Sequence, residues 1–162
     1  MHSIARQSAL ALVLLALPIA AYADLVGSVV KIQDGDSLTV LVGKRQVKVR
    51  LTEIDTPERG QPFGTRARES LSELCAGKEA RVVDKGKDRY GRTLGRVYCA
   101  SVDTSAEQVR RGMAWVFDRF VTDRSLYTLQ DEAKAARRGL WADAKPVPPW
   151  EWRRLKDRGE AK

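Results

Sequence analysis

The sequence predicts a small α+β protein, mainly β, in which five short strands form a Greek-key barrel and helices lie between and after them. Segments rich in β-branched residues recur at short intervals and end at turns containing Gly or Asp. Segments with apolar residues at helical spacing alternate with them. A chain of 162 residues is long enough for one domain with its own core. These patterns predict a barrel with added helices.

The first three strands are expected to form an antiparallel meander. They cover residues 25–33, 37–42 and 47–51 and are joined by the turns "DGD" and "GKRQ". In the third strand, alternation predicts one apolar face, made of Val47, Val49 and Leu51. Arg50 would therefore point away from the core.

Two further strands and three helices complete the prediction. The strands cover 79–85 and 93–99, on either side of the polar loop "GKDRYGR". The first helix has its apolar stripe at Ala67, Leu71, Leu74 and Cys75 and stops at Gly77. The second opens at "TSAE" (104–107), which has the form of a capping box. A short extended piece at 114–117 precedes the third helix, from about Leu126 to Arg138. The Pro-rich, then charged tail over 146–162 is expected to lie on the surface and fray at its end.

Residues 1–23 have the pattern of a secretory signal, with an apolar run, Arg6 before it and Ala21-Tyr22-Ala23 at its end. The alternative is a membrane anchor, but the apolar run is short for a bilayer span and no stop-transfer pattern follows. Cleavage after Ala23 would give a secreted or periplasmic protein without membrane contact. The formal charge of +8 would fall to +7, because the segment contains one arginine and no acid.

The charge and the residue counts limit the chemistry. A basic exported protein can meet nucleic acid, anionic lipid or cell-wall polyanions, and charge does not choose among them. His2 is the one histidine and leaves with the signal, so imidazole catalysis and histidine metal ligands are excluded. Cys75 and Cys99 are too few for a four-thiolate zinc site; they form either one disulfide or two separate buried thiols. Catalysis must use carboxylates, guanidinium groups, hydroxyls, lysines or a hard metal ion.

Five charged residues, four at predicted turns and Arg50 in the strand between two of them, match what metal-dependent phosphodiester cleavage needs. A hard cation requires oxygen ligands, water requires a carboxylate to orient it, and phosphoryl oxygens require cationic donors. The motif "DGDS" supplies Asp36, "IDTPE" supplies Asp55 and Glu58, and Arg50 and Arg92 supply guanidinium groups. Each motif alone is an ordinary turn, helix entry or charged loop. Their joint occurrence favours an active site.

The ordered run "DGDSLTV…VKVRLTEIDTPE…DRYGRTLG…VRRGMAWV" resembles the thermonuclease family, the staphylococcal nuclease-like domains, over residues 25–141. The resemblance implies an OB-fold barrel with three helices, within a nuclease domain at 24–145. It also implies a calcium-dependent enzyme that hydrolyses DNA and RNA and leaves 3′-phosphate ends. No stable protein partner is implied, and a monomer is expected.

By motif, the resemblance implies that Asp36 and Asp55 bind Ca²⁺ together with the Thr56 carbonyl. Glu58 would activate or position water. The guanidinium groups of Arg50 and Arg92 would clamp the phosphate and stabilise the transition state. The nucleotide site would be lined by Arg89, Tyr90 and Phe120.

Three features depart from the family pattern. Ser37 stands where the best-known member has Thr, which keeps the hydroxyl. The segment 58–64, "ERGQPFG", is much shorter than the exposed lobe of that member. Asp118 and Phe120 stand where the family has two tyrosines that touch the nucleotide; Phe120 can stack, whereas Asp118 would repel phosphate.

Two other functions are compatible with the sequence. One is a non-catalytic OB module that binds single-stranded nucleic acid through basic and aromatic surface. The other is an exported envelope protein that binds cell-wall or lipid anions through its net charge.

Overall fold

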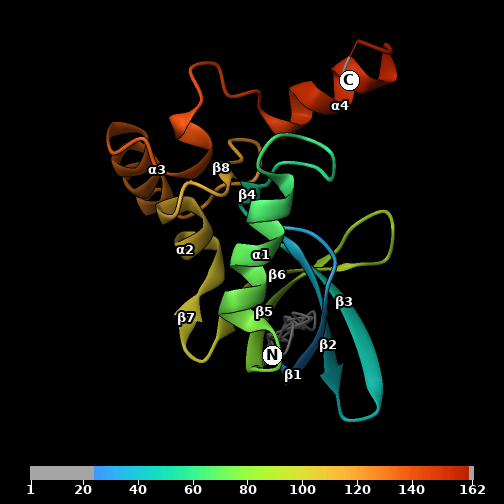
Figure 1. Cartoon of the computed structure of the whole chain (residues 1–162). Helices are drawn as coiled ribbons and strands as arrows, with labels where there is room; N and C mark the ends of the chain where they lie inside the picture. The colour runs from blue at the N-terminus through green and yellow to red at the C-terminus, as the bar shows by residue number, and fades with distance from the viewer. Residues whose placement is uncertain (1–23, 161–162) are drawn as a thin grey trace, which may run out of the picture.

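The computed structural model describes residues 24–160, in which five strands close into a barrel (Figure 1). The sheet order is β3-β2-β1-β5-β6, and a parallel pairing of β3 with β6 closes it. The barrel strands are β1 (Leu25–Ile32), β2 (Ser37–Val42), β3 (Arg45–Leu51), β5 (Glu79–Lys87) and β6 (Thr93–Cys99). The predicted five-stranded, mainly β barrel is confirmed. The predicted signal segment, 1–23, lies outside the described residues.

Three short strands lie outside the five-stranded barrel. β7 (Val102–Asp103) pairs with β6 at the edge of the sheet. β4 (Ile54–Asp55) pairs with β8 (Trp115–Val116) to form a separate two-stranded sheet. This small sheet connects the end of the β3 segment to the helical side of the molecule.

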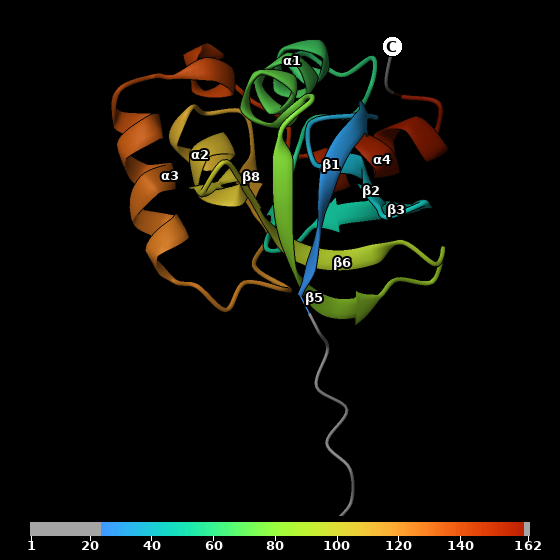
Figure 2. The same cartoon turned by 90° about the horizontal axis from the view of Figure 1, so that it is seen from below.

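Residues 24–160 contain four α-helices rather than the three expected. They are α1 (Gly64–Cys75), α2 (Thr104–Arg110), α3 (Ser125–Ala135) and α4 (Pro149–Asp157), with a 3₁₀ turn at Gly139–Ala142. α1, α2 and α3 gather on one side of the barrel, and α4 lies apart from α3 (Figure 2). Within residues 24–160, none of the helices has the length and hydrophobicity of a bilayer span.

The fourth helix lies in the C-terminal tail, where the sequence predicted no helix. The last residues of the tail, which were expected to fray, lie outside the described residues. Pro149 occupies the first helical position, where its fixed φ suits a helix and its missing N–H costs nothing. Glu151 lies in the first turn and Arg154 and Lys156 in the last, which matches the helix dipole. The local sequence therefore does encode a helix after the prolines.

Two helix boundaries also differ from the sequence prediction. At α2 the N-cap is Asp103, whose carboxylate accepts from the Ala106 N–H at 3.1 Å, whereas Thr104 donates to the Val97 carbonyl. α3 ends at Ala135 rather than Arg138, because the chain turns so that Gly139 can pack directly on Gly112. A Cβ at Gly139 would lie 2.2 Å from the Gly112 carbonyl oxygen.

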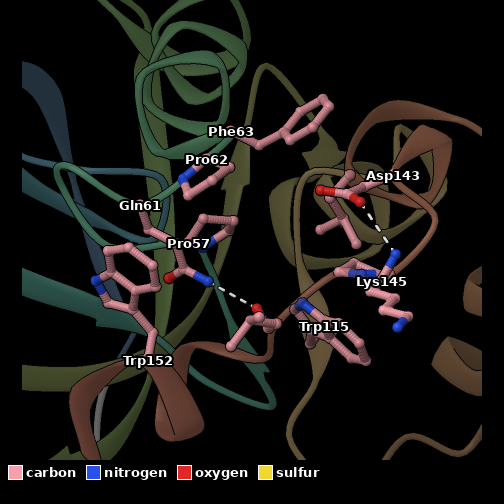
Figure 3. A pocket seen from close by; sticks show the side chains of 11 residues that line it. Pro57, Gln61, Pro62, Phe63, Trp115, Asp143, Lys145 and Trp152 are labelled. Atoms are coloured by element: carbon pink, nitrogen blue, oxygen red, sulfur yellow. Dashed lines mark hydrogen bonds between the residues drawn. The ribbon is translucent and has the colours of Figure 1, made fainter. Parts of the chain in front are cut away.

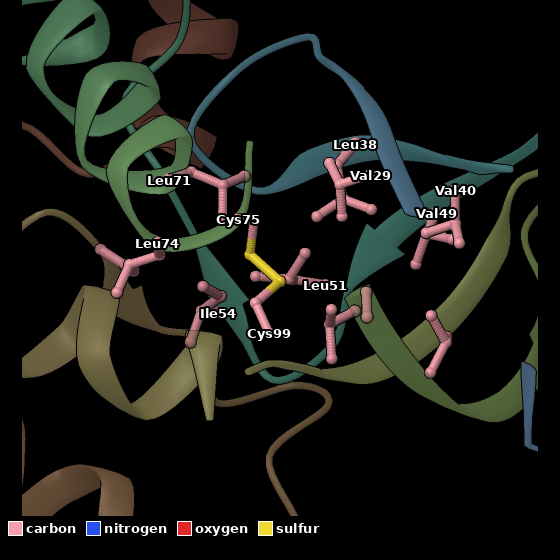
Figure 4. Packing of buried hydrophobic residues seen from close by; sticks show 14 of the residues in the cluster. Val29, Leu38, Val40, Val49, Leu51, Ile54, Leu71, Leu74, Cys75 and Cys99 are labelled. Carbon is pink, nitrogen blue, oxygen red and sulfur yellow. A yellow bond between two sulfur atoms is a disulfide. The ribbon is translucent and has the colours of Figure 1, made fainter. Parts of the chain in front are cut away.

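The core fills the barrel and continues beneath α1 (Figure 4). Val47, Val49 and Leu51 are buried, as their alternation predicts. Cys75 and Cys99 are bonded to each other and join the end of α1 to β6. Both sulfur-bearing residues are fully buried, so the bridge is part of the core.

Candidate active site

The "DGD" turn and β3 bring the first two candidate residues together. In the register of β2 with β3, Ser37 lies opposite Arg50, and the Leu51 N–H donates to the Asp36 carbonyl at 2.8 Å. The strand pairing therefore fixes Arg50 beside the side chain of Asp36. Arg50 Nη2 lies 3.1 Å from Asp36 Oδ2.

The segment after β3 folds back onto the same arginine. Arg50 donates to the Ile54 carbonyl at 3.1 Å and to Asp55 Oδ1 at 3.0 Å. The Thr56 N–H donates to Asp36 Oδ2 at 3.0 Å. One guanidinium group thus joins two carboxylates, and both Asp36 and Asp55 are buried.

Arg92 reaches this pair from the loop between β5 and β6. Its Nε donates to Asp88 Oδ2 at 2.7 Å, which fixes the side chain, and its Nη1 lies 3.4 Å from Ser37 Oγ. Ser37 Oγ in turn donates to Asp36 Oδ1 at 3.2 Å. Ser37, which stands where the family has threonine, therefore links Arg92 to Asp36 through its hydroxyl.

Glu58 is connected through a residue that the sequence analysis missed. Arg153, on α4, donates to Glu58 Oε1 at 2.5 Å and to Asp55 Oδ2 at 2.7 Å. The available signal was "PWEWRR", in which a helix-opening proline and two tryptophans stand in a charged tail. That pattern indicates a segment that packs on the domain.

The three candidate catalytic residues and the two candidate metal-binding carboxylates consequently belong to one connected polar network. The network begins at Arg92 and continues through Ser37. Its other members are Asp36, Arg50, Asp55, Arg153 and Glu58. In residues 24–160 no group of three or more acidic, histidine or cysteine side chains is arranged around a common metal position. The pair that Arg50 joins offers two carboxylates, with the Thr56 backbone beside them.

Burial leaves the charge of Asp55, and of Asp34 in the neighbouring turn, incompletely compensated. Burial raises the pKa of Asp55, and Asp36 adds to the shift, although Arg153 and Arg50 oppose it. Burial and the charge of Asp36 raise the pKa of Asp34, in the same turn, to about 6. Additional positive charge would therefore be favourable here. Carboxylate and carbonyl oxygens are the donors that hard divalent cations prefer, so these residues fit such an ion.

The candidate nucleotide-binding residues lie in two places. Tyr90 is exposed, and Arg89 donates to its hydroxyl at 2.6 Å while the Arg92 guanidinium lies 5.7 Å from its ring centre. Phe120 is also exposed and packs edge-on against Phe117, with 5.2 Å between ring centres. The structure thus places Tyr90 and Arg89 beside the network, whereas within residues 24–160 no hydrogen bond or ring contact joins Phe120 to it.

Asp118, which was expected to repel phosphate, is engaged elsewhere. Its carboxylate accepts from the Tyr127 hydroxyl at 2.7 Å, which raises the pKa of Tyr127. The charge of Asp118 is therefore directed toward α3.

Comparison with known proteins identifies the family. Residues 48–143 match the family model described as "Staphylococcal nuclease homologue". The chain belongs to this family. A "Micrococcal nuclease" of Shigella flexneri is 43% identical over 89% of each chain. An "Uncharacterized endonuclease" of Escherichia coli O157:H7 is 44% identical over 83% of this chain and 88% of the relative. Another from Haemophilus influenzae is 46% identical over 78% and 71%.

Proposed function

We propose that the protein is an exported, calcium-dependent nuclease that hydrolyses phosphodiester bonds of DNA and RNA and leaves 3′-phosphate ends. The observation that supports this function is the connected network at the barrel end, in which two acids, Asp36 and Asp55, share Arg50. Membership of the staphylococcal nuclease homologue family and the nuclease names of its relatives support it as well.

Asp36, Asp55 and the Thr56 carbonyl are the proposed ligands of Ca²⁺. Hard oxygen donors suit Ca²⁺, and the raised pKa of Asp55 indicates that its negative charge is not fully offset by the arginines around it. When bound, the ion would polarise the phosphoryl group and neutralise charge on its oxygens. The remaining steps are assigned to side chains of this chain.

Glu58 is the proposed general base. With Oε1 held by Arg153, Oε2 is left to orient a water and take its proton. The water oxygen bonds to phosphorus, the bond from phosphorus to the 5′ oxygen breaks, and that oxygen takes up a proton. Arg50 and Arg92 would stabilise the charge that builds on the phosphoryl oxygens, because a planar guanidinium matches two of them.

Tyr90, Arg89 and Phe120 are the proposed contacts for the nucleotide. Exposed aromatic rings stack on bases with little sequence preference, and each such contact contributes roughly 1–3 kcal/mol. Arg89 and Arg92 place positive charge around the Tyr90 ring, which favours a phosphate beside the stacked base. This arrangement is consistent with a substrate range that covers both DNA and RNA.

The deciding experiment is a cleavage assay on residues 24–162, with DNA or RNA in Ca²⁺, in Mg²⁺ or in excess chelator. We expect cleavage in Ca²⁺, none in chelator, and products with 3′-phosphate and 5′-hydroxyl ends. Binding without cleavage in every cation would indicate the single-strand-binding module instead. Binding to anionic vesicles with no affinity for nucleic acid would indicate the envelope protein. The intact mass of the exported protein tests cleavage after Ala23.

A further inference from the structure

The C-terminal helix α4 is fixed against the candidate active site by contacts on two sides. On one side, Gln61 Nε2 donates to the Val147 carbonyl at 2.7 Å, which joins the short 58–64 segment to the chain leading into α4 (Figure 3). On the other, the Trp150 ring stacks on Phe117 with 5.5 Å between ring centres and planes 10° apart. α4 thus occupies space next to the segment that is shortened relative to the family pattern.

These contacts hold Arg153 at the two acids. Its guanidinium spans Asp55 Oδ2 and Glu58 Oε1, so a planar fork fixes one carboxylate relative to the other. The Asp55 side chain is only 3% exposed, whereas that of Glu58 is 42% exposed. Asp55 is therefore held in place by the residues packed around it. The Glu58 carboxylate is more exposed, and its bond to Arg153 restricts its position.

The next residue in the helix serves as an internal comparison. The side chain of Arg154 is 68% exposed, and its ion pair is a loose one of 3.8 Å with Glu151 in the preceding turn. The two arginines have the same charge and adjacent positions. Only Arg153 contacts the network.

We propose that Arg153, contributed by α4, is a positioning residue of the active site. Its guanidinium group holds the Glu58 carboxylate at a fixed position relative to the Asp55 carboxylate. This inference rests on the proposed nuclease function. Arg153 acts through Glu58 because its fork binds Oε1 and leaves Oε2 to face a water. The C-terminal helix is then a part of the site, and it supports the region where the shortened 58–64 segment gives less cover.

The same contact has a second consequence for metal binding. Arg153 lies 2.7 Å from an oxygen of Asp55, a proposed ligand, and its positive charge opposes a divalent cation there. Loss of Arg153 should therefore slow turnover and at the same time strengthen Ca²⁺ binding. A site that has merely collapsed would lose both properties.

The experiment compares Arg153→Ala, Arg153→Lys and the control Arg154→Ala with wild type. Steady-state cleavage in Ca²⁺ gives kcat and KM, and calorimetry without substrate gives the Ca²⁺ Kd. For Arg153→Ala we expect kcat to fall about 10²-fold with KM changed less than about threefold, because misplacing a reacting group costs that much. We expect Ca²⁺ to bind about tenfold more tightly, the size of effect that one close opposite charge has on a carboxylate.

Arg153→Lys separates charge from geometry. Lysine keeps the positive charge but cannot span both carboxylates, so kcat should stay at least about tenfold low while the Ca²⁺ Kd remains near wild type. Arg154→Ala should match wild type in both measurements. Circular dichroism and thermal unfolding in chelator establish that each variant is folded, which the half-exposed position of Arg153 favours.

The outcomes are distinct from those of the cleavage assay. If wild-type protein cleaves nothing, the proposed function fails. If wild type cleaves and Arg153→Ala has unchanged or raised kcat, or binds Ca²⁺ no more tightly, the positioning role is wrong although the nuclease assignment stands. Full turnover by Arg153→Lys would also contradict it.

Discussion

Two arginine-centred clusters in this molecule have similar composition and different chemistry. One surrounds Arg96 on β6, which is bound by Glu53, by Asp103 at 2.7 Å and by Asp123 at 2.9 Å. Glu53 Oε1 accepts three further bonds, from the Thr122 N–H and hydroxyl and from the Asp123 N–H, each at 2.7 Å. This cluster is closed, because the arginine and the buried acid both have full sets of partners.

The other cluster surrounds Arg50, and its buried acid is in a different state. At Glu53, burial tends to raise the pKa, but bonds from Thr122, Asp123 and Arg96 outweigh it and the pKa is lowered. At Asp55, burial outweighs the bonds from Arg153 and Arg50, and the pKa is raised. The two clusters therefore differ in whether the bonds and charges around the buried acid outweigh its burial, because Asp55 too accepts bonds, from Arg50 and Arg153. Where they outweigh burial, the carboxylate stabilises the fold. Where they do not, an added cation would lower the remaining cost of burying the negative charge.

The largest expected effect comes from opening the closed cluster. Arg96→Ala leaves Glu53 buried without its cation, and breaking a buried pair in this way costs about 3–5 kcal/mol. Urea unfolding in chelator measures the free energy of unfolding. The control is Arg81→Ala, which removes the exposed pair with Asp24 and should cost less than about 1 kcal/mol. Equal losses in the two variants would contradict a structural role for Arg96.

A second substitution separates the clusters by activity. Glu58→Gln keeps size and hydrogen bonding but removes the proposed base, so kcat should fall about 10²-fold or more. The free energy of unfolding should change by less than about 1 kcal/mol, because the side chain is 42% exposed. Glu69→Gln, on the exposed face of α1, is the matched control for both measurements. Wild-type turnover in Glu58→Gln would remove this residue from the mechanism.

Calcium should stabilise the protein through the Arg50 cluster alone. An ion that binds only the folded state contributes about 2.7 kcal/mol at a concentration one hundred times its Kd. Thermal unfolding with and without Ca²⁺ measures the increment. Asp55→Asn should abolish it and Arg81→Ala should keep it. An increment that persists in Asp55→Asn would place the ion elsewhere.

Much of the barrel could be predicted because its signals are local. Alternation in β3 predicts both the buried face and the outward direction of Arg50, and the turns "DGD" and "GKRQ" predict the meander. The part of the candidate site formed by Asp36 and Arg50 follows from the same strand and turn patterns. Once Ser37 pairs with Arg50 across two strands, Asp36 must lie beside that arginine.

The remainder depends on contacts that are distant in sequence. Arg153 is separated from Asp55 by 98 positions, and α4 is held in place by contacts such as the stacking of Trp150 on Phe117 and the bond from Gln61 to Val147. The cap of α2 was missed for a related reason. Thr104 is recruited by the Val97 carbonyl of a neighbouring strand, which leaves the cap to Asp103. Local sequence patterns do not show when a side chain will bond to a distant strand instead of capping its own helix.

The smallest expected effect is a pair of opposite pH dependences. The pKa of Glu53 is lowered from its ordinary 4.5, so its contribution to stability is present above that pH and is lost as pH falls through the folded value. The pKa of Asp55 is raised from its ordinary 3.8, so the folded state keeps a proton that the unfolded state has released. Stability attributable to Asp55 therefore declines as pH rises from 3.8 to the folded value.

Urea unfolding in chelator at a series of pH values from about 3 to 7 measures both slopes. Relative to wild type, Glu53→Gln should lose less stability on acidification, and Asp55→Asn should lose less as pH rises through the acid range. Because the two slopes oppose each other, they partly cancel in wild-type protein, and the variants are needed to separate them. If both substitutions changed the slope in the same direction, the pKa values of the two carboxylates would not be shifted in opposite directions.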